Sequence, residues 1–244
     1  MRLKVINYLK QTYNKEMLCP SAMGIFINPF YFIKRALLKS ITSHKNYIKG
    51  VVLDFGCGSK PYRELFNCEE YIGLDVIASG HPHQNEDIDV YYDGKTLPFE
   101  DEHFDSVFSS EVLEHVFNID QILDEIHRVL KIQGTCLFTV PFIWDEHEQP
   151  YDFARYTSFG MNHLLEKHGF KILKLEKTSN YIETIWQMWN TYLFHILYTR
   201  NAYLNVLINI IVISPFTILG IILSRILPRN FNFYHNNIIV VRKK

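Results

Sequence analysis

The sequence predicts an α/β fold built on a doubly wound, parallel sheet. Short apolar runs, as at 51–55 and 71–76, alternate with stretches of helical periodicity, as at 120–130. Apolar runs of this length are typical of buried strands, and their alternation with helices indicates βαβ units. The 244 residues, 48% hydrophobic and 21% charged, are enough for one such domain with an attachment. This composition excludes a disordered chain and a disulfide-stapled miniprotein.

Residues 1–49 are predicted to form a basic helical cap. The pair Asn28-Pro29 places a capping side chain before a first-turn proline, which predicts a helix start. Apolar residues then recur at helical spacing with basic residues between them: Phe30, Ile33, Leu37 and Ile41, and Lys34, Arg35 and Lys39. The pattern predicts a basic amphipathic helix, which either covers its own domain or contacts a membrane.

Residues 50–180, together with a last strand in 236–244, are predicted to form the core. Strands are expected at 51–55, 71–76, 105–110, 135–140, 170–175 and 237–242. Helices are expected at 120–130 and 157–168. Thr157 is predicted to cap the second helix, and Gly169 to end it.

Residues 181–235 are predicted to be an apolar helical insertion associated with a membrane. The stretch 203–224 carries no charge over 22 residues, which is long enough to cross a bilayer. The flanking strands belong to one sheet, so the segment must return as a hairpin, a re-entrant loop or an interfacial element. Ser214-Pro215 and Gly220 are the expected bend. A soluble helical subdomain or a dimer interface is the alternative.

Charge is unevenly distributed along the chain. Residues 1–50 carry a net +8, residues 51–180 carry −14, and residues 181–244 carry +5. An acidic centre repels a phosphate backbone, so no nucleic-acid partner is expected, whereas basic, apolar ends suit an anionic membrane surface. Four scattered cysteines without a CxxC pair favour a reducing compartment, and no signal peptide is predicted. We therefore expect a cytoplasmic protein, peripheral or monotopic at the membrane; its oligomeric state is not predicted.

A glycine turn and an acidic residue follow the first two strands. Gly56 and Gly58 let the backbone approach a ligand closely, and Asp75 ends the next strand, where a carboxylate can accept both hydroxyls of a ribose. Pro61 stands where a dinucleotide fingerprint needs its third glycine. A nucleoside-containing ligand other than NAD is therefore indicated, and a dehydrogenase is disfavoured.

The segment Val52–Gly58 resembles motif I of the class I S-adenosylmethionine-dependent methyltransferases. Three further segments, 93–99, 104–116 and 128–134, are similar to the type 11 branch of that family. The resemblance implies a Rossmann-like seven-stranded sheet of order 3-2-1-4-5-7-6 and the cofactor S-adenosyl-L-methionine. The implied cofactor contacts are Asp54, Gly56, Cys57, Gly58, Asp75, Val76, Asp93, Gly94, Ser110 and Glu111.

The acceptor is expected at the loop 141–156, because loops at the carboxyl ends of strands build the site in doubly wound sheets. The loop resembles those of methyltransferases from cell-surface polysaccharide gene clusters, and its aromatic and carboxylate groups suit a sugar. His147 is the predicted general base, since its free pKa lies near working pH, with Asp145 and Tyr156 as further catalytic candidates. Asp152, Arg155 and His115 are the predicted substrate contacts.

No metal is assigned from the sequence. If residues 111–115 are helical, Glu111, Glu114 and His115 share one face, and with His147 they offer the ligand types of a divalent-ion site. Positioning of cofactor and substrate is the alternative role for these side chains.

The predicted function is methylation of a hydroxyl on a saccharide or lipid-linked glycan at the cytoplasmic membrane face. A lipid or quinone methyltransferase and a non-catalytic, membrane-bound partner module of a glycan assembly complex are the alternatives. A ribose methyltransferase acting on RNA is disfavoured by the acidic centre.

Overall fold

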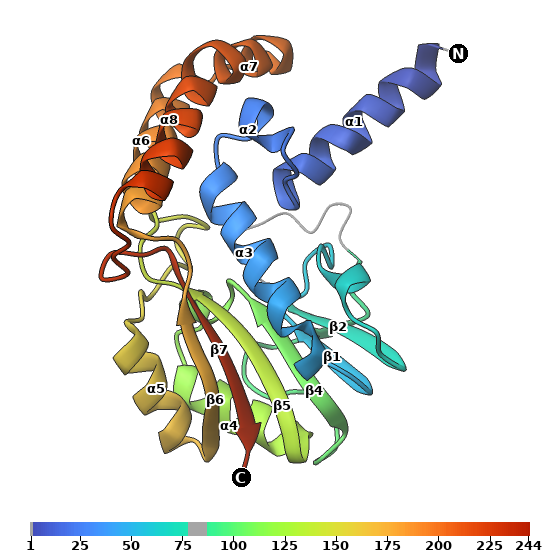
Figure 1. Cartoon of the computed structure of the whole chain (residues 1–244). Coiled ribbons are helices and arrows are strands. Elements are labelled where there is room, and N and C mark those ends of the chain that lie inside the picture. The colour runs from blue at the N-terminus through green and yellow to red at the C-terminus, as the bar shows by residue number, and fades with distance from the viewer. Residues whose placement is uncertain (1, 78–86) are drawn as a thin grey trace. The chain divides into compact units, whose positions relative to one another are not determined.

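A computed structural model describes residues 2–77 and 87–244 of the chain (Figure 1). It contains two compact units. One unit comprises residues 1–39 and 178–235, and the other comprises residues 40–177 and 236–244. The second unit holds all strands of the described chain, and the first is helical.

The second unit is built on a seven-stranded sheet of order β3-β2-β1-β4-β5-β7-β6. Strands β1 to β5 pair in parallel, and β7 runs antiparallel to both β5 and β6. The predicted sheet order is therefore confirmed. The strands are β1 (Val51–Phe55), β2 (Glu70–Val76), β3 (Val90–Tyr92), β4 (Phe104–Ser110), β5 (Leu130–Pro141), β6 (Phe170–Lys177) and β7 (Asn236–Lys243).

Two helices, α4 (Ile119–Val129) and α5 (Ser158–Lys167), supply apolar side chains to the core of this unit. Ile122, Leu123 and Ile126 of α4 are fully buried, because apolar residues at this spacing share one helix face. The side chain of Thr157 accepts a hydrogen bond from the N–H of Gly160, which confirms the predicted cap.

The sequence analysis omitted strand β3 and placed the start of β5 five residues too late. A three-residue edge strand carries too little periodicity to be recognised. Between β1 and β2 the chain forms only the 3-10 turn Arg63–Leu65 and no α-helix. Pro61, three residues after Gly58, lacks the backbone N–H that a helix interior would use.

His168 follows α5 and links it to α4. Its Nδ1 lies 2.5 Å from Asp124 Oδ1, and its Nε2 lies 2.8 Å from Asp120 Oδ1. Burial opposes protonation, but the hydrogen bonds to the two carboxylates raise the pKa of His168 above its usual value. Protonated His168 should therefore stabilise the fold at low pH.

We expect His168→Gln to lower the free energy of unfolding at pH 5.5 by less than about 1 kcal/mol, because both carboxylates are solvent-exposed. Because the pKa of His168 is raised in the folded state, its contribution to stability is fully present below the unfolded-state pKa of about 6.5. This contribution is lost as the pH rises through the pKa of the folded state. Urea denaturation of both proteins at pH 5.5 and 8.5 measures it. A wild-type advantage that grows with pH would contradict the assignment.

The first unit contains α1 (Arg2–Leu18), α2 (Gly24–Ile27), most of α3 (Tyr31–His44) and a pair of long helices. In the pair, α6 (Tyr181–Leu197) is followed by a helix made of α7 (Ala202–Ile208), a π-helical turn (Asn209–Ile213) and α8 (Ser214–Ile226). Helices α6 and α8 pack against each other. The insertion thus returns on itself as a hairpin, and β6 and β7 lie side by side in one sheet.

The expected bend at Ser214-Pro215 and Gly220 is wrong. The helix runs on through both sites, and the chain reverses before it, where Asn201 caps α7. The π-helical turn directly precedes Pro215. Such turns re-pair the carbonyls that a proline leaves free. Gly220 serves close packing instead, since a Cβ there would lie 2.8 Å from atoms of Phe32 and Trp186.

The hairpin buries polar side chains and exposes apolar ones. Gln187, Asn190 and Thr217 are completely buried, and Asn190 Nδ2 donates to Thr217 Oγ1 at 2.9 Å. Large apolar side chains of the pair are exposed: Ile185, Trp189, Tyr192, Ile196, Tyr203, Leu204, Leu207, Ile210, Ile211, Ile218, Leu219, Ile222 and Ile226. This arrangement inverts the polarity of a water-soluble helix pair.

The apolar stripe of the basic N-terminal helix is buried. Ile33, Leu37 and Ile41 are at most 4% exposed. The helix predicted from its start at Asn28-Pro29 is confirmed, but its apolar face is not free to contact a membrane.

Candidate functional site

The turn after β1 is shaped by two glycines with positive φ. Gly56 has φ +73°, and a Cβ there would lie 2.4 Å from a methyl group of Val112. Gly58 has φ +47°, but a Cβ there would lie within 4 Å of no atom of the described residues. Gly56 is therefore required by packing, whereas the space beside Gly58 is open to a ligand that approaches the backbone.

Asp54 and Cys57 lie inside the protein beside this turn. The Asp54 carboxylate accepts a hydrogen bond from the Tyr71 hydroxyl at 2.7 Å. Burial raises the pKa of Asp54 to about 7, although the hydrogen bond from Tyr71 acts to lower it. The N–H of Cys57 donates to the carbonyl of Leu74, as the N–H of Gly56 does. Both predicted contacts therefore support the turn in this structure, and direct cofactor contact by them stays a prediction.

Asp75 connects the turn to the end of β2. Its Oδ2 accepts from the N–H of Gly58 at 3.0 Å, and its Oδ1 accepts from the N–H of Val76 at 2.8 Å. The carboxylate thus lies directly beside the open space at Gly58. This juxtaposition of a carboxylate and an uncovered glycine fits the ribose of S-adenosyl-L-methionine.

Asp93 and Gly94 form a tight turn just after β3. The Asp93 carboxylate accepts from the N–H groups of Lys95 and Thr96, which lowers its pKa. Gly94 has φ +80°, and its carbonyl accepts from Asn118 Nδ2 at 3.1 Å. The side chain of Asp93 is thus engaged with its own turn, and contact of Asp93 and Gly94 with the cofactor stays a prediction.

A chain of hydrogen bonds joins β4, β5 and β7 at Ser110 and Glu111. Ser110 Oγ lies 2.9 Å from Thr139 Oγ1, and Thr139 donates to Glu111 Oε1 at 2.7 Å. Asn236 Nδ2 donates to the other oxygen of Glu111 at 2.5 Å. Glu111 has φ +58°, a conformation that costs free energy in a residue with a side chain. The sequence analysis did not identify Thr139 or Asn236, because only strand pairing brings them to Glu111.

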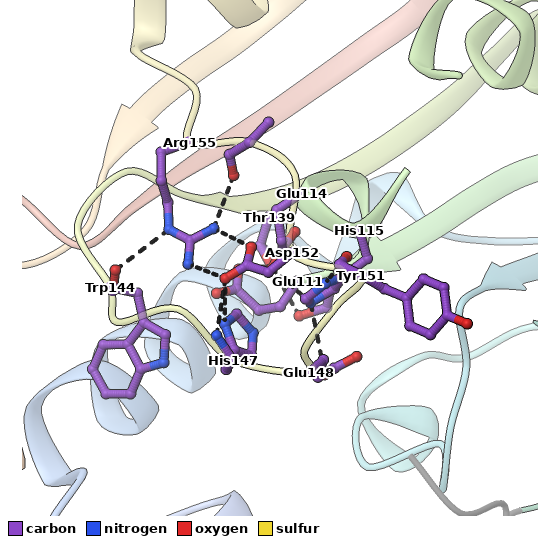
Figure 2. A network of polar contacts seen from close by, with 12 residues as sticks. Glu111, Glu114, His115, Thr139, Trp144, His147, Glu148, Tyr151, Asp152 and Arg155 are labelled. Carbon is purple, nitrogen blue, oxygen red and sulfur yellow. Dashed lines mark hydrogen bonds and ion pairs between the residues drawn. The ribbon is translucent and has the colours of Figure 1, made fainter. Parts of the chain in front are cut away.

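The loop after β5 is organised by Arg155 (Figure 2). Its Nη1 and Nη2 lie 2.5 and 2.7 Å from the two carboxylate oxygens of Asp152. The same guanidinium donates to the carbonyls of Trp144, Asp145 and Ala154. Burial opposes ionisation of Asp152, but Arg155 and the His147 N–H hold its pKa at about 2. Both predicted substrate contacts thus act within the loop in this structure, and a role toward substrate stays a prediction.

Three of the predicted residues, Glu114, His115 and His147, meet beneath this loop. Their ligand atoms all lie within 4.8 Å of one another. Glu111 is not part of this cluster. Residues 111–115 do not form one α-helix, so the condition for a shared face is not met: the chain passes through the left-handed conformation of Glu111 into the 3-10 turn Leu113–His115.

Each histidine of the cluster is held through Nδ1. His115 Nδ1 lies 2.9 Å from the carbonyl oxygen of Tyr151. His147 Nδ1 lies 3.2 Å from Asp152 Oδ2 and from the Asp145 carbonyl oxygen. Nδ1 of both rings is thus engaged by groups of the loop (Figure 2). Asp145 therefore contributes its backbone to the position of the predicted base.

Glu114 is completely buried. Neither of its carboxylate oxygens has a hydrogen-bond partner among the described residues, and neither has Nε2 of His115. Burial, with the nearby Glu111 charge, raises the pKa of Glu114 well above its usual value. Burial of a charged carboxylate is costly, and either protonation or a bound cation would reduce that cost.

The aromatic residues near the site differ in exposure. Tyr156 packs against the hydrophobic core, and its carbonyl accepts from Asn237 Nδ2. Phe117, Tyr151 and Phe153 instead form an exposed group, with the ring centroids of Phe117 and Phe153 5.2 Å apart. This aromatic group adjoins the histidine cluster through the contact between His115 and Tyr151.

The family model of the methyltransferase domain matches residues 53–138, which include the turn, Asp75 and the Glu114–His115 pair. An uncharacterized protein of Methanocaldococcus jannaschii is 32% identical over 97 residues. The aligned stretch spans 38% of this chain and 38% of that relative.

Solved structures share the fold at low identity. The [4+2]-cyclase SpnF is 20% identical with a TM-score of 0.54, and the match covers 85% of this chain and 81% of that one. Phosphoethanolamine N-methyltransferase 2 of Haemonchus contortus, solved with S-adenosyl-L-methionine, is 18% identical with a TM-score of 0.51, covering 93% and 58%. A protein of Galdieria sulphuraria described as a putative sarcosine dimethylglycine methyltransferase is 18% identical with a TM-score of 0.51. The match covers 85% of this chain and 84% of that one. The chain thus contains a segment that matches the methyltransferase domain, and it shares the fold of these solved structures.

Proposed function

We propose that the chain transfers a methyl group to a hydroxyl of a saccharide or lipid-linked glycan at the cytoplasmic face of a membrane. S-adenosyl-L-methionine supplies the methyl group when bound. The observation that carries the proposal is the proximity of the exposed aromatic group to the polar cluster of the loop after β5. Aromatic faces stack on sugar rings, while carboxylates and imidazoles bind and deprotonate hydroxyls.

The residues have separate tasks in this proposal. Asp75 and the turn at Gly58 hold the nucleoside half of the cofactor, which aligns donor and acceptor. Asp152 orients His147 through Nδ1, so that Nε2 is the basic atom for the acceptor hydroxyl. Phe117, Tyr151 and Phe153 bind the acceptor.

The test is transfer of a radiolabelled methyl group to fractions of a membrane extract by the purified full-length protein. Label in the glycan or lipid-linked glycan fraction supports the proposal. Label in the simple lipid or quinone fraction would favour the alternative that the exposed apolar hairpin supports. Cofactor binding with no labelled fraction would instead favour a non-catalytic module. The structure of SpnF, which shares this fold, is described as that of a [4+2]-cyclase, so the fold alone does not establish methyl transfer.

We also propose that the helix hairpin attaches the protein to the membrane. The helix Ala202–Ile226 has a mean hydropathy of 2.6 in its most apolar window, and only 28% of that window is buried. Buried polar and small residues with apolar residues outside are typical of helix packing in lipid. Trp189, Tyr192 and Tyr203 suit the interface between lipid and water.

Replacing Leu207, Ile211 and Ile222 by serine should reduce binding to anionic liposomes at least about tenfold, because each exposed apolar side chain loses its transfer free energy. Flotation of the full-length proteins measures this. Phe159→Ser is the control, since Phe159 is 85% exposed on α5 of the other unit. Wild-type protein that remains in the soluble fraction at low salt would contradict attachment.

A further inference from the structure

The cluster of Glu114, His115 and His147 has the composition of a metal site. Two imidazoles and one carboxylate are ligands of divalent transition metals in proteins. Their ligand atoms lie within 4.8 Å of one another, close to twice a metal–ligand distance of about 2.1 Å.

The unpaired atoms of the cluster favour a cation. Both oxygens of Glu114 and Nε2 of His115 are buried and lack hydrogen-bond partners in the described structure. His115 Nε2 lies 3.7 Å from Glu114 Oε1 and 3.6 Å from Glu148 Oε1. A bound cation would satisfy these atoms together and would compensate the buried carboxylate.

The surroundings of the histidines match the outer shell of a metal site. Metal-binding histidines generally donate their second ring N–H to a carbonyl or a carboxylate, which orients the ring and fixes its tautomer. His115 Nδ1 has the Tyr151 carbonyl as its partner. His147 Nδ1 has Asp152, whose carboxylate is held by Arg155. Since Nδ1 of each ring has a partner, Nε2 is the nitrogen of each ring that would bind the ion.

We propose that Glu114, His115 and His147 bind a divalent first-row transition-metal ion such as Zn²⁺. With three protein ligands, the ion keeps open coordination positions. These positions suit an oxygen atom of the acceptor, a role that rests on the function proposed above. Nε2 of His147 would then bind the ion and would not act as the base assigned above. The ion would instead hold that oxygen and lower the pKa of the hydroxyl, whose proton would pass to solvent. The proposal departs from the sequence analysis, which assigned no metal.

The test is a titration of the chelator-treated, full-length protein with Co²⁺, followed by its visible absorption, and with Zn²⁺ by calorimetry. We expect one ion per chain. His147→Gln and Glu114→Gln should each weaken binding at least about 100-fold, and Asp152→Asn about 10-fold or more, as loss of an outer-shell partner does. His163→Gln, a substitution at an exposed histidine of α5, is the control and should bind like the wild type.

His147 is partly exposed, so His147→Gln should remain folded even if Glu114→Gln does not; circular dichroism verifies both. Absence of stoichiometric binding by the wild type, or undiminished binding by folded His147→Gln, would overturn the proposal. The titration contains neither cofactor nor acceptor. A failed methyl-transfer assay therefore counts against the proposed function alone, and a failed titration against the metal site alone.

Discussion

Asp75→Ala is expected to weaken binding of S-adenosyl-L-methionine by about 100-fold or more. Two hydrogen bonds from ribose hydroxyls to a carboxylate contribute roughly 1.5–3 kcal/mol each, and every 1.4 kcal/mol is tenfold in affinity. The substitution also removes the acceptor for the N–H of Gly58, which loosens the turn beside the open space. Calorimetry with the cofactor and with its demethylated product measures the effect.

Glu70→Ala is the matched control for Asp75→Ala. Glu70 begins the same strand at its opposite end and is exposed. The Glu70→Ala protein should therefore bind the cofactor like the wild type. Wild-type affinity in a folded Asp75→Ala protein would show that the cofactor binds elsewhere, and the functional assignment of the turn would be wrong.

Arg155→Ala is expected to lower the free energy of unfolding by about 3 kcal/mol. It should also make the loop 142–156 susceptible to proteolysis. Removing one partner of a largely buried ion pair leaves the other charge uncompensated. Asp152 is 4% exposed and would be that charge. Because Asp152 also contacts His147, the variant should lose activity and metal binding as well.

Urea denaturation and limited proteolysis test this expectation. Arg155→Lys should recover only part of the stability, because a lysine cannot make the paired contacts of the guanidinium fork. Lys167→Ala removes an exposed ion pair with Asp120 and should cost less than about 1 kcal/mol. A loop that resists protease in Arg155→Ala would contradict the organising role of Arg155.

The core of the fold could be predicted from the sequence because its signals are local. The apolar run at 51–55, the helix face of Ile122, Leu123 and Ile126, and the cap at Thr157 each depend on neighbouring residues. The order of the strands was predicted from the family resemblance, because strand pairing depends on contacts between distant segments and cannot be read from any one of them.

The site could be predicted only in part. The sequence indicated Glu114, His115 and His147, but not that Glu114 is buried with no hydrogen-bond partner among the described residues, nor that Glu111 lies outside their cluster. Those properties depend on the left-handed backbone of Glu111 and on Asn236 from β7, which is far away in sequence. The roles of Asp152 and Arg155 in shaping the loop likewise required the folded geometry.

The pairing of β6 with β7 brings the two ends of the helix hairpin together at one edge of the sheet. Lys177 lies opposite Asn237, so the two strands end side by side where the helical insertion leaves and rejoins the sheet. A two-residue turn is enough to join antiparallel strands at such a point. The junction should therefore tolerate replacement of the whole intervening segment by a short turn without a change in the register of β6 and β7.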